Sequence, residues 1–304
     1  MSRVIVAGGG AAGMMAALSA GQRGHQVILL EKNEKLGKKL YITGKGRCNV
    51  TNACDMDGLF QGIVTNQKFL YSSFYQFTNK DMMDLLEQYG CPLKVERGSR
   101  VFPVSDKSSD VINALGRALK EHLVEVHLNS RIKELIIQDG CCVGVRLDKI
   151  GKNVIGGAEI GPEGEIFGDL VIVATGGLSY PSTGSTGDGF LWAKAAGHRI
   201  TDLSPALAPF EILEEDGKRL QGLSLKNIRI SLRSGNRERY QEFGEMLFTH
   251  FGVSGPVILS ASSFIAKELR KKQPMVLSVD LKPALSLEQL DNRIVRDFQE
   301  GKNR

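Results

Sequence analysis

Three glycines near the N-terminus have the spacing of a dinucleotide-binding turn. Gly8, Gly10 and Gly13 follow a short apolar run and precede a stretch rich in small residues, after which a second apolar run begins. Gly8 permits a tight turn, Gly10 lets the backbone approach a pyrophosphate, and Gly13 lets helix and strand pack closely. The N-terminus of the predicted helix offers unpaired N–H groups to an anion. The pattern predicts a nucleotide-binding βαβ unit, with Ala11 and Ala12 also at the pyrophosphate.

A carboxylate ends the apolar run that follows the predicted helix. Residues 27–30 are Val-Ile-Leu-Leu, a sequence typical of a strand, and Glu31 comes directly after them. A carboxylate at the tip of this strand accepts hydrogen bonds from ribose hydroxyls and repels a 2′-phosphate. We therefore expect Glu31 to bind the adenosine ribose of FAD or NAD in preference to NADP, with Lys32 flanking the same ribose.

A glycine-rich basic stretch at residues 35–52 follows the ribose position. Its glycines interrupt both helical and strand periods, which predicts a loop. Accessible N–H groups together with basic and amide side chains suit an anionic ligand, so we expect the loop to lie against the cofactor. The alternative is a solvated basic loop without a ligand. The cofactor contacts predicted here are Lys38, Lys39, Gly46, Arg47, Cys48 and Asn49.

A continuous apolar run at residues 170–174 predicts a parallel strand that is covered on both faces. Ligands of open α/β sheets bind at the carboxyl ends of the strands. Thr175, Gly176 and Gly177 follow this strand and are therefore predicted cofactor contacts.

The Ser/Thr/Gly-rich stretch at residues 179–189 connects that strand to a predicted helix at residues 190–196. Because it leads from a buried strand to a helix N-terminus, we interpret it as a ligand loop, with a flexible linker as the alternative. Asp188 and Thr186 are the candidate N-caps of the helix.

Four motifs occur in a characteristic order along the chain. They lie at residues 44–52 (Gly-Lys-Gly-Arg-Cys-Asn-Val-Thr-Asn), 100–105, 174–189 and 248–256. Together they resemble the BaiN/RdsA family of NAD(P)/FAD-dependent oxidoreductases, and the resemblance spans nearly the whole chain. It implies an α/β fold: a Rossmann-like FAD-binding domain of the two-dinucleotide-binding-domain flavoprotein type, with an inserted, β-rich second domain.

The same resemblance implies a function. FAD is the expected cofactor, NAD(P)H an electron donor and the substrate a small molecule. Either NAD(P)H-driven reduction of an activated double bond or O₂-linked oxidation of a small amine agrees with it. Such flavoproteins hold adenine after the third parallel strand, which makes Ile132 the predicted adenine contact. His250 is a candidate proton donor beside the flavin, against the alternative of a structural or interface histidine.

Members of this family return from the inserted domain to the FAD domain and complete it with a closing strand. The sequence in hand ends soon after a predicted helix at residues 286–298, which belongs to the insert. We therefore expect only the first part of the FAD domain, with weaker retention of the cofactor. A truncated, non-catalytic flavin or nucleotide binder and a plain NAD-dependent dehydrogenase are the alternative functions.

Periodic apolar positions predict the elements that support the site. Helices are expected within residues 66–90, where Phe69, Phe74 and Phe77 form a stripe typical of a core and Asn79 is a candidate cap. The remaining elements expected in the first domain are a helix at 110–123, the third parallel strand at 124–128, and an antiparallel meander with strands at 135–138, at 142–147, around Val154 and around Ile166.

The pattern changes near Leu203, where we place the domain boundary. Residues 1–203 form the FAD-binding domain and residues 204–304 the inserted β-rich domain with helices. The predicted elements of the second domain are strands at 223–232 and 275–281, a helix beginning at Pro256, and a helix beginning with a capping box formed by Ser286 and Gln289.

Composition narrows the class of protein. The chain has 304 residues, of which 42% are hydrophobic and 24% charged, and contains no apolar run long enough to span a membrane. The first strand begins too early for a signal peptide, so we expect a cytoplasmic protein with five reduced cysteines. The cysteines lack metal-ligand spacing, and a net charge of +5 is too small to predict nucleic-acid binding. Nothing in the sequence indicates an oligomeric state.

Overall fold

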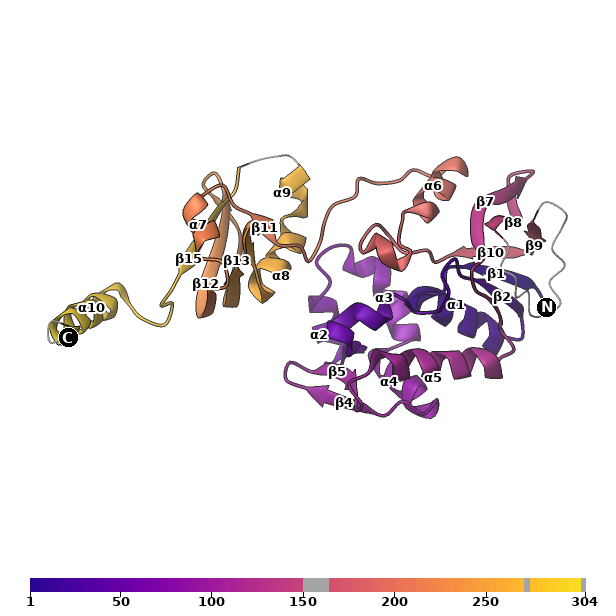
Figure 1. Cartoon of the computed structure of the whole chain (residues 1–304), viewed down its shortest axis with the longest axis horizontal. Helices are drawn as coiled ribbons and strands as arrows, with labels where there is room; N and C mark the ends of the chain where they lie inside the picture. The colour runs from indigo at the N-terminus through magenta and orange to yellow at the C-terminus, as the bar shows by residue number, and fades with distance from the viewer. Residues whose placement is uncertain (150–163, 271–273, 302–304) are drawn as a thin grey trace. The chain divides into compact units, whose positions relative to one another are not determined.

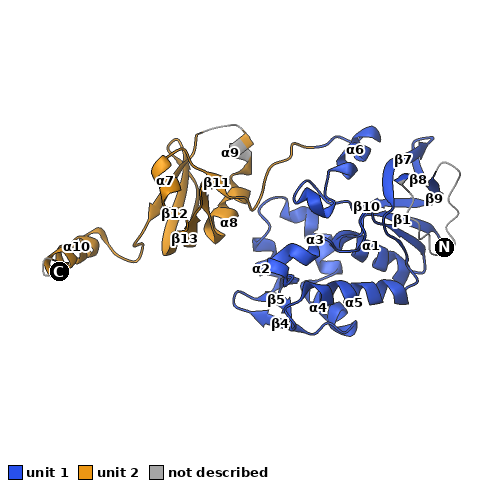
Figure 2. Cartoon of the chain, viewed as in Figure 1, with its two compact units in different colours: residues 1–200 blue, residues 201–304 orange. Residues whose placement is uncertain are grey.

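The computed structural model describes residues 1–149, 164–270 and 274–301. The chain divides into two compact units, Met1–Ile200 and Thr201–Arg304 (Figures 1 and 2). Each unit has a hydrophobic core of its own. The strand expected around Val154 lies outside the described residues.

A four-stranded parallel sheet forms the centre of the first unit. Its strand order is β10-β1-β2-β6. Figure 1 labels β10, β1 and β2. Helix α1 (Ala11–Gln22) joins β1 (Arg3–Ala7) to β2 (Gln26–Leu30), which confirms the predicted βαβ unit. β6 (Glu125–His127) is the predicted third strand, and β10 (Leu170–Val173) pairs with the other edge of β1.

Side chains alternate between the two faces of each strand, so the apolar runs of β1 and β2 supply two cores. Val4 and Leu29 pack on one face with residues of α1 and of α5 (Ser108–Glu121). Ile5 and Ile28 pack on the other face with residues of an antiparallel meander. Burial on both faces is why these strands read as continuous apolar sequence.

The predicted antiparallel meander is present, and its strand order is β7-β8-β9. It consists of β7 (Arg131–Gln138), β8 (Cys141–Lys149) and β9 (Glu165–Phe167). Ile132, Val145 and Ile166 point from it into the core under the parallel sheet.

β10 is less covered than its sequence predicts. Leu170 is 56% exposed and Val173 is 43% exposed, so the prediction of a strand covered on both faces is wrong for this chain. The physical reason is the position of β10, which lies at the edge of the sheet and has β1 as its only parallel neighbour among the described strands.

Two predictions for the helices between β2 and β6 are wrong. α3 (Gln67–Gln76) buries none of its residues, and Phe69 is 83% exposed, so the predicted core stripe is wrong. Instead, Phe74 and its aromatic neighbours gather around Phe60 of α2 (Met56–Gln61).

The cap of helix α4 (Asn79–Gln88) is Thr78, one residue before the predicted Asn79. Thr78 Oγ1 accepts from the Asp81 N–H while the Asp81 carboxylate accepts from the Thr78 N–H, a reciprocal capping box. The amide of Asn79 instead donates to the carbonyls of Asn52 and Cys54.

A small antiparallel sheet follows the glycine-rich stretch. Its order is β3-β5-β4, with β3 (Thr51–Asn52), β5 (Arg100–Pro103) and β4 (Leu93–Glu96). The stretch before it, predicted as a loop, contains 3-10 turns, η1 (Leu40–Gly46), interrupted by left-handed residues at Gly44 and Lys45. The loop prediction is therefore only partly right.

A five-stranded antiparallel sheet forms the second unit, in the order β11-β14-β13-β12-β15. β12 and β15 are the two predicted strands, whereas β13 was not predicted. The bounds of the strands are β11 (Phe210–Glu211), β12 (Ser224–Ser234), β13 (Arg237–Phe248), β14 (Gly252–Ser254) and β15 (Val276–Asp280).

Helix α8 (Pro256–Phe264) covers one face of this sheet and begins at the predicted proline. Its Ile258 packs in one cluster with Ile230 of β12 and Met246 of β13. The remaining helices are α7 (Glu215–Arg219), α9 (Ala266–Arg270) and α10 (Leu287–Gly301). The predicted capping box of α10 is present, since Ser286 and Gln289 exchange hydrogen bonds.

Candidate functional site

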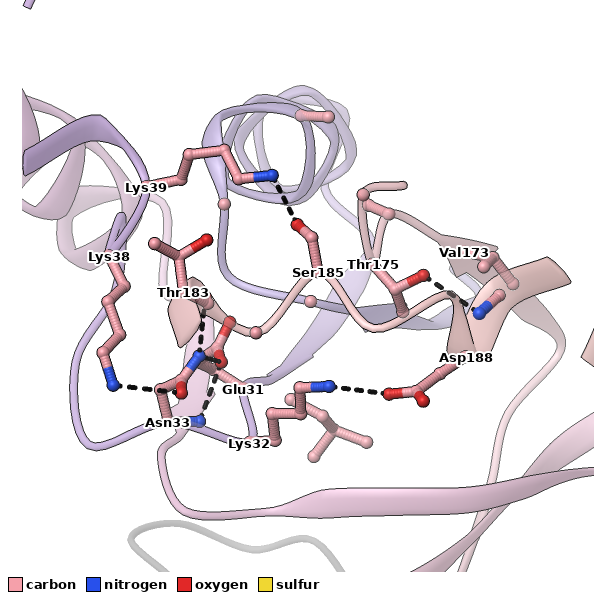
Figure 3. Close-up of a pocket in the computed structure, with 18 of the residues that line it drawn as sticks. Glu31, Lys32, Asn33, Lys38, Lys39, Val173, Thr175, Thr183, Ser185 and Asp188 are labelled. Carbon is pink, nitrogen blue, oxygen red and sulfur yellow. Dashed lines mark hydrogen bonds and ion pairs between the residues drawn. The ribbon is translucent and has the colours of Figure 1, made fainter. Parts of the chain in front are cut away.

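A cavity of about 590 Å³ lies at the carboxyl ends of β1, β2 and β10, in the first unit (Figure 3). Its size falls within the range of small-molecule and cofactor sites. The segments that follow these three strands supply most of its wall, and the loop at residues 179–189 supplies another part. It is also where ligands bind in open α/β folds.

The glycine turn forms one wall of this cavity. Gly8 has φ +107°, and a Cβ on Gly13 would lie 1.7 Å from the Gly8 carbonyl oxygen, so each requires glycine. A Cβ on Gly10 would meet no atom within 4 Å. Gly8, Gly10, Ala11 and Ala12 line the cavity, whereas Gly13 packs behind it. α1 has neither a side-chain cap nor an acidic residue in its first turn, so its terminal N–H groups and dipole suit an anion.

Glu31 is buried at the cavity wall, with 7% of its surface exposed. Its Oε2 accepts from the N–H of Gly9 at 2.6 Å. Its Oε1 accepts from the backbone N–H and from Nδ2 of Asn33, at 2.8 and 2.7 Å. The carboxylate therefore joins the glycine turn to the end of β2 and lies where the sequence predicts the ribose.

Two lysines at the cavity have acidic partners. Lys32 Nζ lies 2.7 Å from a carboxylate oxygen of Asp188 and 2.6 Å from Thr186 Oγ1. Burial raises the pKa of Asp188, but the hydrogen bond and charge of Lys32 outweigh it, so the pKa lies below its ordinary value. Lys38 Nζ lies 3.2 Å from Glu34.

Lys39 is different, because its hydrogen-bond partners are neutral. Its Nζ donates to Ser185 Oγ at 2.6 Å and to the carbonyl oxygen of Ser179 at 2.8 Å. Burial lowers the pKa of Lys39 below its ordinary value. Lys32, Lys38 and Lys39 all line the cavity, and of the three only Lys39 has no ion pair with a described carboxylate.

The loop at residues 179–189 is fastened to the segment after β2 by three side chains (Figure 3). Asn33 reaches Thr183, Lys39 reaches Ser185, and Lys32 reaches the start of α6 (Asp188–Ala195). This loop includes the short 3-10 turn η2 (Pro181–Thr183).

The predicted caps of α6 are wrong. Gly187, with φ +84°, is the N-cap, and no side chain caps the helix. The carboxylate of Asp188 turns to Lys32 instead, and Thr186 lies between them through its hydroxyl.

Most of the predicted cofactor contacts line this cavity. Ile132, Thr175 and Gly176 do so, together with the glycine-turn, Glu31 and lysine positions described above. Gly13 and Gly177 do not, and neither do Gly46, Arg47, Cys48 and Asn49.

Arg47 is held outside the cavity lining by two carboxylates and an aromatic ring. It pairs with Glu96 and lies 2.7 Å from Asp106, and its guanidinium is 4.1 Å from the centre of the Phe102 ring. These contacts raise the pKa of Arg47, through the hydrogen bonds to Glu96 and Asp106. Burial raises the pKa of the neighbouring Cys48 thiol, which disfavours its reactive thiolate form.

The candidate proton donor His250 belongs to the second unit and does not line the cavity. It is exposed and lies edge-on to Phe251, with ring centres 4.8 Å apart.

Several lining residues were not predicted as contacts. Some of them could have been found from the sequence, because Asn33 lies two residues after the predicted ribose contact Glu31 and others lie in the predicted ligand loop. The unpredicted polar lining residues are Asn33, Thr43, Ser130, Thr183, Ser185 and Asp188, and the unpredicted aromatic ones are Phe190 and Trp192.

The family model of the HI0933-like protein Rossmann domain matches residues 2–269. The chain belongs to this family. It is the BaiN/RdsA family of FAD-dependent oxidoreductases that the motifs predict. Among the described residues, no helix is long and apolar enough to cross a membrane, and no group of His, Cys, Asp or Glu is arranged to hold a metal ion.

Two curated relatives are similar along most of the chain. The 3-dehydro-bile acid delta(4,6)-reductase of Clostridium scindens is 29% identical over 293 residues, which cover 95% of this chain and 67% of the relative. The ribosomal RNA dihydrouridine synthase of Escherichia coli is 29% identical over 260 residues, which cover 86% of this chain and 60% of the relative. The chain thus spans about two thirds of the length of these relatives.

A solved structure of Escherichia coli quinol fumarate reductase FrdA shares the fold. It is 16% identical, has a TM-score of 0.51, and covers 74% of this chain and 43% of that chain. This likeness concerns the fold alone, which is the α/β architecture with a β-rich insert that the sequence predicts.

Proposed function

We propose that the cavity of the first unit binds FAD and that the chain is the cofactor-binding part of an FAD-dependent oxidoreductase. One observation carries the proposal: the uncapped N-terminus of α1, the buried carboxylate of Glu31 and the Lys39 cation, which pairs with no described carboxylate, all line one cavity of cofactor size. These groups match the anionic and ribose parts of a dinucleotide.

Different lining residues would contact different parts of the ligand. Gly8, Gly10 and the first turn of α1 would hold the pyrophosphate, with Lys39 as the counter-cation. Glu31 would accept from the ribose, and Ile132 would lie against the adenine. The flavin, when bound, supplies the two-electron chemistry, while the protein orients it and excludes water.

NAD(P)H is the proposed electron donor, and the proposed reaction is reduction of an activated double bond in a small molecule. Two relatives carry names that support this direction, because one is a delta(4,6)-reductase and the other makes dihydrouridine, the hydrogenated form of uridine. Oxidation of a small amine by O₂ is the less supported direction.

An FAD titration followed by anaerobic NADPH tests the proposal. We expect bound FAD to change its visible spectrum, and NADPH to bleach the absorbance near the flavin maximum. Binding of FAD without bleaching would support a nucleotide binder and contradict an NADPH-dependent oxidoreductase. Binding of NAD without any binding of FAD would contradict the cofactor assignment and favour a plain dehydrogenase.

A further inference from the structure

Asn33 joins three segments around the cavity. Its backbone N–H and its Nδ2 both donate to Oε1 of Glu31. Nδ2 also donates to the carbonyl oxygen of Thr183 at 3.2 Å, and Lys38 donates to Oδ1 at 3.4 Å. The backbone carbonyl of Asn33 accepts from the N–H of Asn129 at 2.9 Å. Figure 3 shows Asn33 between Glu31 and Thr183. Together with the bond from Asn129, these contacts connect the end of β2, the segment after β6 and the loop that carries Thr183.

The contacts of Glu31 are unequal between its two oxygens. Oε1 accepts two N–H groups of Asn33, which occupy both lone-pair positions of that oxygen. Among the described residues, Oε2 accepts one N–H group, from Gly9, which leaves a second acceptor position on that oxygen. Because the carboxylate lines the cavity, a ribose hydroxyl there meets an oxygen that can still accept a hydrogen bond.

We propose that Asn33 is a positioning residue for ribose recognition, which holds Oε1 of Glu31 so that Oε2 is the oxygen that accepts a ribose hydroxyl. The proposal rests on the proposed binding of an adenosine-containing cofactor. Without the Asn33 amide, Oε1 has a free acceptor position and the carboxylate loses a restraint on its rotation. Recognition of the hydroxyl then weakens more than the contacts with the pyrophosphate, which other residues make.

The test compares ADP with 2′-deoxy-ADP by isothermal titration calorimetry on the whole chain. ADP carries the adenosine and phosphate groups, so it probes the proposed contacts with the adenine, the ribose and the pyrophosphate. The wild-type chain should prefer ADP on the order of tenfold, the value of one hydrogen bond to a charged group. Asn33→Ala should reduce this preference to about two- to threefold while it changes the affinity for 2′-deoxy-ADP much less.

Asn113→Ala is the matched control, because Asn113 is exposed on α5 and does not line the cavity. It should keep the wild-type preference. Asn33→Asp keeps the size of the side chain but removes its donor, and it serves if Asn33→Ala fails to fold; it should also lose the preference. Thermal melting establishes that each variant is folded.

The outcomes separate this proposal from the proposed function. An equal loss of affinity for both nucleotides in Asn33→Ala would show a general structural role and overturn the positioning role, while nucleotide binding would stand. An unchanged preference in both Asn33 variants would overturn it as well. If the wild-type chain bound neither nucleotide, the proposed function would fail and the role of Asn33 with it.

Discussion

At the scale of single residues, the charged groups of the cavity differ in how completely they are partnered. Both oxygens of Glu31 accept hydrogen bonds, and Lys32 and Lys38 each form an ion pair with a carboxylate. Among the described residues, the partners of Lys39 are neutral oxygens, and its position is partly buried, where a charge is costly without a counter-ion. An anionic ligand would complete this arrangement, in agreement with the proposed place of the pyrophosphate.

Changes of Glu31 test the ribose assignment. Glu31→Gln should weaken FAD binding by roughly tenfold, because a neutral amide has one acceptor oxygen in place of two and leaves an N–H of the protein or a ribose hydroxyl unpaired. Glu31→Arg should abolish binding, because it replaces the acceptor with a donor cation. Quenching of flavin fluorescence measures both. Glu214→Gln is the control, because Glu214 is exposed in the second unit and does not line the cavity. Unchanged affinity in the Arg variant would rule out the assignment.

The charge of Lys39 should make nucleotide binding depend on pH. Burial lowers the pKa of Lys39 below its ordinary value of 10.5, and a bound pyrophosphate favours the protonated form. The affinity for ADP should therefore fall as the pH rises through the pKa of the free protein, since the proton must then be taken up on binding.

Variants of Lys39 identify the group that titrates. Lys39→Met should lose about tenfold in ADP affinity at neutral pH and lose the alkaline dependence, while its affinity for adenosine stays the same. Lys39→Arg should retain tight binding and show no such dependence, because arginine stays protonated. If all three proteins had the same pH profile, Lys39 would not be the phosphate contact.

At the scale of elements, two glycines of one turn have separable purposes. Gly13 lets α1 approach the end of β1, because a Cβ there would overlap the Gly8 carbonyl. Gly10 leaves space on the cavity side, where a Cβ meets no protein atom. Gly13 is therefore needed for the packing of α1 against β1, whereas Gly10 leaves room for the proposed ligand.

Alanine at each position separates these purposes. Gly13→Ala should cost about 3 kcal/mol of unfolding free energy or more, because the clash involves backbone that cannot repack. Gly10→Ala should cost less than about 1 kcal/mol and yet weaken ADP binding, because the methyl group occupies the ligand side. Urea unfolding and calorimetry measure the two effects. Equal stability of the two variants would contradict the packing role of Gly13.

At the scale of the whole molecule, the two units have separate cores and different central sheets. The first unit contains the parallel sheet and every residue that lines the cavity, and the second contains an antiparallel sheet covered by α8. Separate cores allow separate unfolding transitions, so the two units should respond independently to a core mutation.

Ile230→Ala tests this independence. Ile230 is fully buried against α8, so its truncation should destabilise the second unit by about 2–5 kcal/mol. In calorimetric melting one transition should move to lower temperature, while the transition of the first unit and ADP binding stay in place. A shift of both transitions by the same amount would show that the chain unfolds as one cooperative body.

The sequence alone determined the parts that depend on local chemistry. The glycine spacing, the acidic end of β2 and the apolar runs predicted the βαβ unit, because φ angles, close packing and burial restrict these positions to few residue types. Pro256 and the Ser286–Gln289 capping box likewise marked helix starts through local hydrogen bonding. The family motifs then identified the family.

Only the tertiary structure decided which side chains share the cavity and which are committed elsewhere. The sequence predicts Arg47 as a contact of the anionic cofactor, but in the structure it forms ion pairs with Glu96 and Asp106, which come from distant segments. Asn33 is not among the predicted contacts, yet its backbone N–H and its side chain donate to the carboxylate of Glu31. The physical reason is that the hydrogen-bond and ion-pair partners of a polar side chain determine whether it is available to a ligand. Partners more than a hundred residues apart, such as Lys39 and Ser185, meet only when the sheet brings their strands together.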